Sequence, residues 1–238
     1  MGRLLNATNP NNTLRFLRPL SVTKKSRILD VGCGHGAVLN CLRGVGLRNL
    51  LGIDPFNRED LRYANGLEIR KMGLREVVGE WDIVIFLHSF EHVPDPAEAL
   101  DTVSRLLAPG GPCVIGIPLA SSYAWNYYGV NWVQLDAPRH YYLHSVKSMG
   151  ILAERAGLKI RKVVHDSTAF QFWGSEQYLK GISLRDKRSY AETRDESIFS
   201  RKEIAGFANR ARELNEQGRG DQALFYLVKS NDHAGREA

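Results

Sequence analysis

The chain has 238 residues, a formal net charge of +6 and an apolar share of 43%. This length allows one large domain or a domain with insertions, and the apolar share is ordinary for a packed globular protein. No apolar run approaches the ~20 residues that a membrane-spanning helix needs, and no secretion signal is visible. Because the three cysteines show neither disulfide nor zinc spacing, we expect reduced thiols and a cytoplasmic setting.

The positive charge leaves two interpretations of the chain's partners. Basic residues outnumber acidic ones near the start, where they could form a patch for nucleic acid, a phosphorylated substrate or a membrane surface. Aromatic residues are not interleaved with these charges as single-strand binding requires, so we favour a solvated face. We therefore expect no nucleic acid, no transmembrane segment and at most a peripheral membrane contact, with the oligomeric state open.

Short apolar runs alternate with helical segments in the first half of the chain, which is typical of a parallel α/β sheet. Buried parallel strands are continuous apolar runs, and residues 83–87 show this clearly. The helix expected over 96–107 carries an apolar stripe with a period of about 3.6 residues. We expect strands near 27–31, 49–54, 67–71, 82–87 and 112–117, and helices near 35–43, 58–64 and 96–107.

The pattern changes after the fifth expected strand. Residues 118–142 are rich in aromatic residues, glycine and proline. Residues 167–219 are charged, and because a structureless loop of that length is uncommon, we expect them to be mainly helical. The remaining expected elements are a helix near 145–156, strands over 159–165 and 222–229, and a disordered tail over 231–238.

The most informative stretch is Asp30-Val31-Gly32-Cys33-Gly34-His35-Gly36, which continues an apolar run. Glycine lacks a Cβ, so the backbone can bend sharply there and approach a ligand closely. The following helix would direct its free N–H groups at that ligand. The dinucleotide fingerprint is Gly-x-Gly-x-x-Gly, whereas position 37 is alanine here. The tighter spacing favours a nucleoside joined to an amino acid over a nicotinamide dinucleotide.

A second apolar strand ends in a carboxylate, in Leu50-Leu51-Gly52-Ile53-Asp54-Pro55. A carboxylate at this place can accept hydrogen bonds from both ribose hydroxyls, as in dinucleotide folds. The alternative is that Asp54 caps a following helix, because aspartate is a preferred N-cap residue. The glycine turn upstream favours the ribose role.

The stretch from Asp30 to Gly36 resembles the first motif of the class I S-adenosylmethionine-dependent methyltransferases. The resemblance implies S-adenosylmethionine as the cofactor, with its methionine part on the glycine turn and its ribose on Asp54. Cys33 is expected to fill a place that needs a small residue rather than to react. The cofactor-binding residues implied are Asp30, Gly32, Cys33, Gly34, Gly36, Asp54 and His88.

The same resemblance implies an α/β fold: a Rossmann-like, seven-stranded, mostly parallel sheet with an antiparallel last strand and helices on both faces. The expected methyltransferase core spans 27–166 and 220–230. An N-terminal cap segment, 1–26, precedes it, and a helical insertion, 167–219, comes before the last strand.

The run Leu87-His88-Ser89-Phe90-Glu91-His92-Val93-Pro94-Asp95-Pro96 follows the fourth strand. Ligands of open α/β sheets lie outside the carboxyl ends of the strands, so we expect His88 and Ser89 to line the cofactor pocket near the transferred methyl. Glu91-His92-Val93 is similar to a segment of many small-molecule methyltransferases whose histidine faces the cofactor or the substrate. Two alternatives are a structural role for Glu91 and His92, or a metal held with His88. Without a second cluster, we expect no metal.

Residues 118–144 contain many aromatic side chains, whose flat faces suit stacking on a sugar ring or another organic acceptor. The pattern Gly-x-x-Trp-x-x-Leu-Asp-x-Pro-Arg-His resembles the ubiquinone-biosynthesis-like and glycan-type branch of the small-molecule methyltransferases. The resemblance places Trp132, Asp136, Arg139 and His140 at the acceptor. The alternative is an aromatic lid packed on the core, with a plain ion pair between Asp136 and Arg139.

The cofactor determines the chemistry. A sulfonium methyl is a strong electrophile, so the protein has mainly to align the nucleophile. For a hydroxyl nucleophile a general base contributes ~10²–10⁴-fold, and His140 and His88 are the catalytic candidates, with His140 favoured. We predict an enzyme that methylates a small molecule, by O-methylation of a sugar, glycan precursor or related hydroxyl compound. The alternatives are a non-catalytic scaffold of this fold and a nucleic-acid methyltransferase, whose Asn/Asp-Pro-Pro-aromatic signature is missing here.

Overall fold

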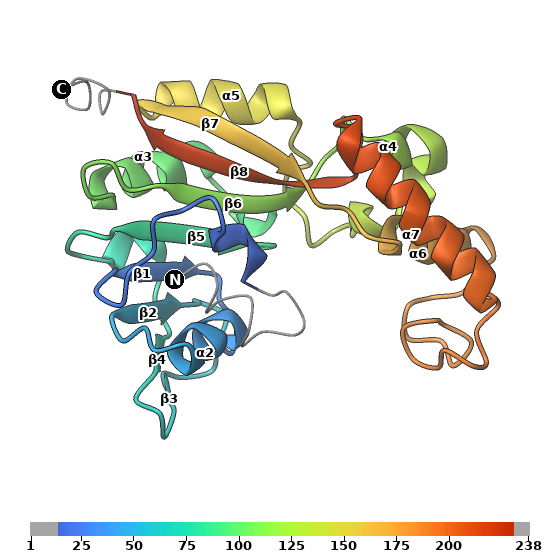
Figure 1. Cartoon of the computed structure of the whole chain (residues 1–238), viewed down its shortest axis with the longest axis horizontal. Helices are drawn as coiled ribbons and strands as arrows, with labels where there is room; N and C mark the ends of the chain where they lie inside the picture. The colour runs from blue at the N-terminus through green and yellow to red at the C-terminus, as the bar shows by residue number, and fades with distance from the viewer. Residues whose placement is uncertain (1–13, 231–238) are drawn as a thin grey trace. The chain divides into compact units, whose positions relative to one another are not determined.

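The computed structural model describes residues 14–230. An eight-stranded sheet runs through them in the order β3-β4-β2-β1-β5-β6-β8-β7 (Figure 1). β1 pairs in parallel with β2 and β5, and β5 pairs in parallel with β6. Figure 1 shows β8 running opposite to β6 and β7. The strands are β1 (Ile28–Val31), β2 (Leu50–Ile53), β3 (Leu61–Arg62), β4 (Glu68–Arg70), β5 (Ile83–Leu87), β6 (Cys113–Pro118), β7 (Leu158–His165) and β8 (Gln222–Lys229).

The longer helices begin at residues that satisfy free backbone N–H groups. Asp95 accepts a hydrogen bond from the Glu98 amide at the start of α3, and Ser200 and Glu203 form a capping box at the start of α7. The α-helices are α2 (Ala37–Gly44), α3 (Pro96–Leu106), α4 (Tyr123–Tyr128), α5 (Val146–Arg155), α6 (Phe170–Leu179) and α7 (Arg201–Glu216). Short 3-10 turns are η1 (Arg15–Leu17), η2 (Leu74–Glu76), η3 (Phe90–His92), η4 (Gly129–Asn131) and η5 (Val133–Leu135).

The central strands are buried because their residues are apolar on both faces. Every residue of β1 and β6 is buried, and in β5 only Leu87 is partly exposed. This is the burial expected of parallel strands with helices on both sides. The predicted α/β fold, a mostly parallel sheet with an antiparallel last strand, is confirmed.

The helix predicted over 58–64 is wrong. Residues 61–62 form β3, which pairs antiparallel with β4 and adds an eighth strand to the predicted seven. The turn between them contains Asn65 and Gly66; Gly66 has φ +76° and donates its N–H to the Tyr63 carbonyl. Asn65 Oδ1 accepts a hydrogen bond from the Leu67 amide, and longer hairpin loops commonly place a glycine in the left-handed conformation, as Gly66 is here. That local preference outweighs the weak helical pattern upstream.

The described residues fall into two compact units. Unit 1 comprises residues 14–116, 150–162 and 225–230, and unit 2 comprises 117–149 and 163–224. The sequence-based boundaries of a cap, a core and an insertion stay a prediction, and the predicted disordered tail, 231–238, lies outside the described residues. Between positions 14 and 230, no helix is both long enough and apolar enough to cross a membrane.

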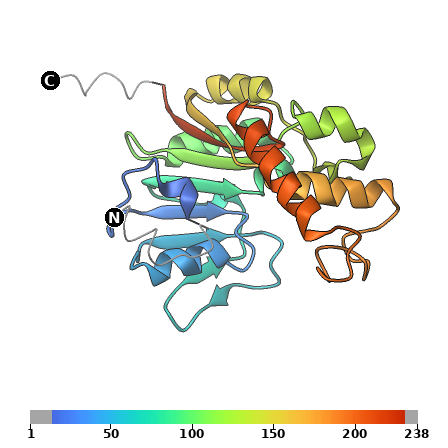
Figure 2. The same ribbon diagram turned by 45° about the vertical axis from the view of Figure 1, so that its right-hand side comes forward.

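Each unit has its own apolar core. In unit 1 the core includes Ile28, Leu29 and Phe86, and the Tyr226 hydroxyl donates a hydrogen bond to the Phe16 carbonyl. In unit 2, α4, α6 and α7 supply most of the core. In Figure 1 α7 lies in front of α6, whereas the turned view of Figure 2 shows both helices. The rings of Phe172 and Phe207 stack at 5.5 Å between those two helices. A buried apolar cluster of unit 2 contains Ala124, Tyr128, Trp132, Phe172, Ala211 and Leu214.

Candidate functional site

The glycine turn after β1 is left-handed at each of its glycines. Gly32, Gly34 and Gly36 have φ values of +70°, +54° and +73°. A Cβ on Gly32 would lie 2.5 Å from Cβ of Ser89, whereas a Cβ on Gly34 would meet no atom within 4 Å. Gly32 is therefore required by the close approach of the loop after β5. Gly34 leaves open space beside the turn, which a ligand can use.

Asp54 joins the end of β2 to this turn. Its Oδ2 accepts a hydrogen bond from the Gly34 amide and its Oδ1 accepts one from the Phe56 amide, both at 2.9 Å. No helix follows Asp54 directly in the described chain, so it stabilises a turn rather than capping a helix. A carboxylate has about four lone-pair sites, so Asp54 retains acceptor capacity for ribose hydroxyls.

Asp30 is a buried carboxyl group beside the same turn. Its exposed fraction is 3%. Burial, and then repulsion from Asp54, raises the pKa of Asp30 from 3.8 to about 7. A cationic group of a ligand placed nearby would favour the ionised form. Asp30 is thus able to respond to the sulfonium or ammonium charge of a cofactor.

Cys33 has a packing role in the turn. A Cβ on Gly52 would lie 2.6 Å from Cys33 Sγ, so the thiol fills the space that Gly52 leaves. Burial raises the pKa of the Cys33 thiol, which keeps it in the unreactive protonated form. Cys33, Cys41 and Cys113 are all free thiols.

The loop after β5 brings His88 to the same edge of the sheet. His88 has φ +56°, an uncommon conformation for a residue other than glycine. Its side chain is 54% exposed, and its Nδ1 lies 3.8 Å from Oε1 of the buried Glu91. Ser89 donates a hydrogen bond from Oγ to the Val31 carbonyl at 2.6 Å. Because β2, β1 and β5 are parallel neighbours, their carboxyl ends bring Asp54, the glycine turn and His88 together.

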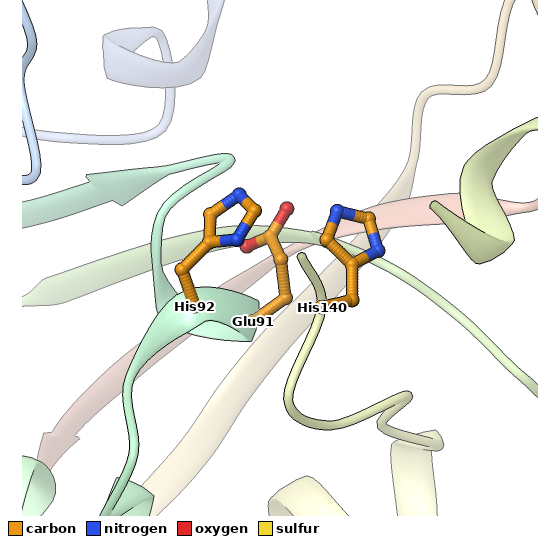
Figure 3. A group of neighbouring side chains, drawn as sticks. All are labelled: Glu91, His92 and His140. Atoms are coloured by element: carbon orange, nitrogen blue, oxygen red, sulfur yellow. The ribbon is translucent and has the colours of Figure 1, made fainter. Parts of the chain in front are cut away.

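Glu91 and His92 extend from η3 in unit 1, and Figure 3 labels both, together with His140 of unit 2. Glu91 is 1% exposed. Because a buried carboxylate needs compensating partners, its imidazole neighbour His88 is consistent with the structural alternative considered for this segment. The prediction that the site needs no metal stays a prediction.

The predicted acceptor residues of unit 2 are organised around Asp136. Asp136 follows η5 with φ +43°. Its Oδ1 accepts hydrogen bonds from Arg139 Nε at 3.1 Å and Nη2 at 2.6 Å, while its Oδ2 lies 3.6 Å from His140 Nε2. The Arg139 side chain is 73% exposed and that of His140 is 8% exposed. The ion pair between Asp136 and Arg139, considered above as an alternative, is present. The Asp136 carboxylate also lies near the His140 imidazole.

Trp132 lies in the core of unit 2 instead of on its surface. Its exposed fraction is zero. Its indole Nε1 donates to Oδ2 of Asp221 at 3.0 Å, and Gln134 Nε2 donates to the same oxygen. Burial raises the pKa of Asp221. Direct contact between Trp132 and an acceptor stays a prediction that this burial disfavours. The Trp132 ring instead anchors residues 132–140, the predicted acceptor loop, in the core of unit 2.

The residues that hold the acceptor loop were missed by sequence reasoning. Asp221 is 89 residues from Trp132, and Ser175, whose Oγ accepts from the Val133 amide, is 42 residues from its partner. Neither residue belongs to a recognisable motif. The one available signal is weak: an aspartate directly before the apolar run of β8 is unusual at the start of a buried strand.

Comparison with known proteins identifies the family. The methyltransferase domain family matches residues 4–163, and the chain belongs to it. The predicted class, the class I S-adenosylmethionine-dependent methyltransferases, and its cofactor are thereby confirmed.

Similar proteins indicate the branch of the methyltransferases to which the chain is related. The chain is 29% identical over 171 residues to the ubiquinone biosynthesis O-methyltransferase of Psychrobacter cryohalolentis, a match that covers 62% of this chain and 65% of the relative. It is 30% identical over 169 residues to the protein of the same name from Thiobacillus denitrificans, covering 63% and 72%. The S-adenosylmethionine-dependent methyltransferase of Thermotoga maritima shares the fold, with a TM-score of 0.56, 17% identity and coverage of 96% and 90%.

Proposed function

We propose that the chain is an enzyme that transfers the methyl group of S-adenosylmethionine to a hydroxyl group of a small molecule. The proposed acceptor is a sugar, a glycan precursor or a related hydroxyl compound. The observation that supports the cofactor part of this proposal is the hydrogen bond between the Gly34 amide and Asp54, beside a left-handed turn with open space at Gly34. The O-methyltransferases among the relatives support oxygen as the methylated atom.

Unit 1 supplies the groups proposed to hold the cofactor. The turn from Gly32 to Gly36 would carry the methionine part, and Asp54 would accept hydrogen bonds from the ribose. Asp30 would ionise when the cationic cofactor binds, since an adjacent positive charge stabilises a carboxylate. His88, half exposed at the end of β5, would face the transferred methyl.

Unit 2 supplies the proposed general base. The acceptor oxygen attacks the methyl carbon, the carbon–sulfur bond breaks, and the hydroxyl proton passes to an imidazole nitrogen. His140 is the first candidate because Asp136 Oδ2, 3.6 Å from its Nε2, would stabilise the imidazolium that forms. His88 with Glu91 is the second candidate, at a similar separation of 3.8 Å.

Calorimetric titration tests the cofactor half. We expect S-adenosylmethionine to bind the intact chain, and Asp54→Ala to weaken binding by about 1–3 kcal/mol, because hydrogen bonds to a charged group are lost. Glu59→Gln is the matched control, since Glu59 is an exposed acid in the same loop. Folded protein that gives no heat at millimolar cofactor would contradict the proposal.

Methyl transfer from labelled cofactor to fractionated metabolites tests the acceptor half. For a labelled hydroxyl compound, His140→Gln should lower kcat by roughly 10²–10⁴-fold and leave cofactor affinity unchanged. His88→Gln should alter cofactor affinity as well, because His88 belongs to unit 1. If His88→Gln lowers kcat and His140→Gln does not, the base assignment is reversed. Prior dialysis against a chelator should leave the rate unchanged, as the metal-free prediction requires.

A further inference from the structure

Unit 2 contains a hollow that the methyl-transfer chemistry proposed above does not use. Its volume is about 510 Å³, within the range of roughly 300–1,000 Å³ typical of small-molecule sites. It lies between the loop after η5 and the segment that follows α6. The lining residues are Arg139, Tyr178, Ser183, Leu184, Arg185, Ala191 and Glu192.

Arg139 connects this hollow to the predicted acceptor loop. Its guanidinium is oriented by Asp136, which accepts from both Nε and Nη2 through one carboxylate oxygen. The side chain is nevertheless largely exposed. A guanidinium has five N–H donors in a rigid plane, so one already oriented loses little freedom when it binds a ligand's oxygens.

Tyr178 adds a neutral hydrogen-bonding group near the same pair. Burial raises the pKa of Tyr178, with a further contribution from Asp136, while Arg139 acts in the opposite direction. The phenol therefore keeps its proton at neutral pH and can donate it to an acceptor oxygen. Its ring, with Leu184 and Ala191, gives the hollow apolar surface for the organic part of a ligand.

Arg185 is held much more weakly than Arg139. Its Nη1 lies 3.4 Å from Glu192 Oε1, and its side chain is 93% exposed. Exposed ion pairs contribute little to stability, so a ligand anion can replace Glu192 at small cost. Glu192 is the acidic residue of the lining.

We propose that this hollow binds an oxyanion, a phosphate or a carboxylate, carried by the methyl acceptor. This inference rests on the proposed function and narrows its substrate class to acidic hydroxyl compounds. Planar guanidinium groups match the geometry of both anions, and Arg139 and Arg185 provide two of them. The hydroxyl groups of Tyr178 and Ser183 provide further donors, and the neutral sugar ring would contact the apolar lining.

Calorimetry on the full chain tests the site with three probes: glucose 1-phosphate, glucuronate and uncharged glucose. We expect at least one anion to bind at least tenfold more tightly than glucose. Arg185→Gln and Arg139→Gln should each weaken that anion's binding tenfold or more, and Glu192→Gln should tighten it. Lys187→Gln is the matched control, because Lys187 is an exposed cation of the same segment that does not line the hollow.

The outcomes separate this inference from the proposed function. Stronger binding of glucose 1-phosphate identifies phosphate, and stronger binding of glucuronate identifies carboxylate. The proposed site is wrong if neither anion binds more tightly than glucose. It is also wrong if Lys187→Gln and Arg185→Gln weaken anion binding equally. Titration of S-adenosylhomocysteine into the same samples tests the cofactor half independently. Because Arg185 is so exposed, its variant remains informative even if Arg139→Gln fails to fold.

Discussion

The cofactor edge of unit 1 and the acceptor loop of unit 2 are built by different means. In unit 1 the proposed binding groups are backbone amides and carboxylates that directly follow β1, β2 and β5, so parallel pairing alone brings them together. In unit 2 the loop is held by Asp221 and Ser175, far away in sequence. A cofactor site of this kind is a property of the fold, whereas the acceptor site depends on particular tertiary contacts.

The largest effect on stability should come from Gly32→Ala, because the backbone of the cofactor edge is crowded at Gly32. The new methyl would meet Ser89 Cβ at 2.5 Å at a φ of +70°. The free energy of unfolding should fall for two reasons: the left-handed conformation costs alanine about 1–2 kcal/mol, and overpacking costs about 1–3 kcal/mol more. Urea denaturation measures this loss.

Gly34→Ala is the control for that variant. It has similar strain, φ +54°, but open space around the new methyl. We expect only about 1–2 kcal/mol of destabilisation, together with a clear loss of cofactor affinity. Equal destabilisation by the two variants would show that the approach of Ser89 is unimportant.

Trp132→Phe should produce the next largest effect, and it addresses unit 2. The substitution removes one of the donors to the buried Asp221 oxygen and should lower the free energy of unfolding by about 2 kcal/mol. Affinity for S-adenosylhomocysteine should not change, because the proposed cofactor groups belong to unit 1. Trp125→Phe is the comparison, since Trp125 is only partly buried. A parallel loss of cofactor affinity in Trp132→Phe would refute the separation of the two sites.

The smallest expected effect is a pH dependence of cofactor binding. Asp30 has a pKa of about 7 in the free protein, raised from 3.8 by burial and then by Asp54. Because the folded state holds this proton more tightly than the unfolded chain, the stability it contributes is present below pH 3.8 and is lost as the pH rises towards 7. Binding of a cationic cofactor needs the ionised form, so affinity should fall about tenfold from pH 8 to pH 6.

Calorimetry in buffers of different ionisation enthalpy detects the proton released on binding. Asp30→Asn should abolish both the proton release and this pH dependence. A variant that retains them would assign the effect to another group.

The parallel strands were predictable because each is a continuous apolar run that stays buried in any α/β arrangement. β1, β2, β4, β5 and β6 all lie within two residues of their predicted bounds. The helix predicted before β4 failed because the Asn65-Gly66 turn has its own strong preference. In residues 167–219 the prediction of helix holds for α6 and α7, while residues 180–200 form turns.

By itself, the sequence determined the fold class and the family. It also placed the proposed cofactor groups at one edge, since glycines and carboxylates that directly follow strands are carried to one side of a parallel sheet. Tertiary structure alone decided two features around the acceptor residues: it buried Trp132 against Asp221 and brought Arg139 and Arg185 to one hollow. These contacts join residues separated by tens of positions. No local pattern specifies them, because they depend on how distant helices pack against one another.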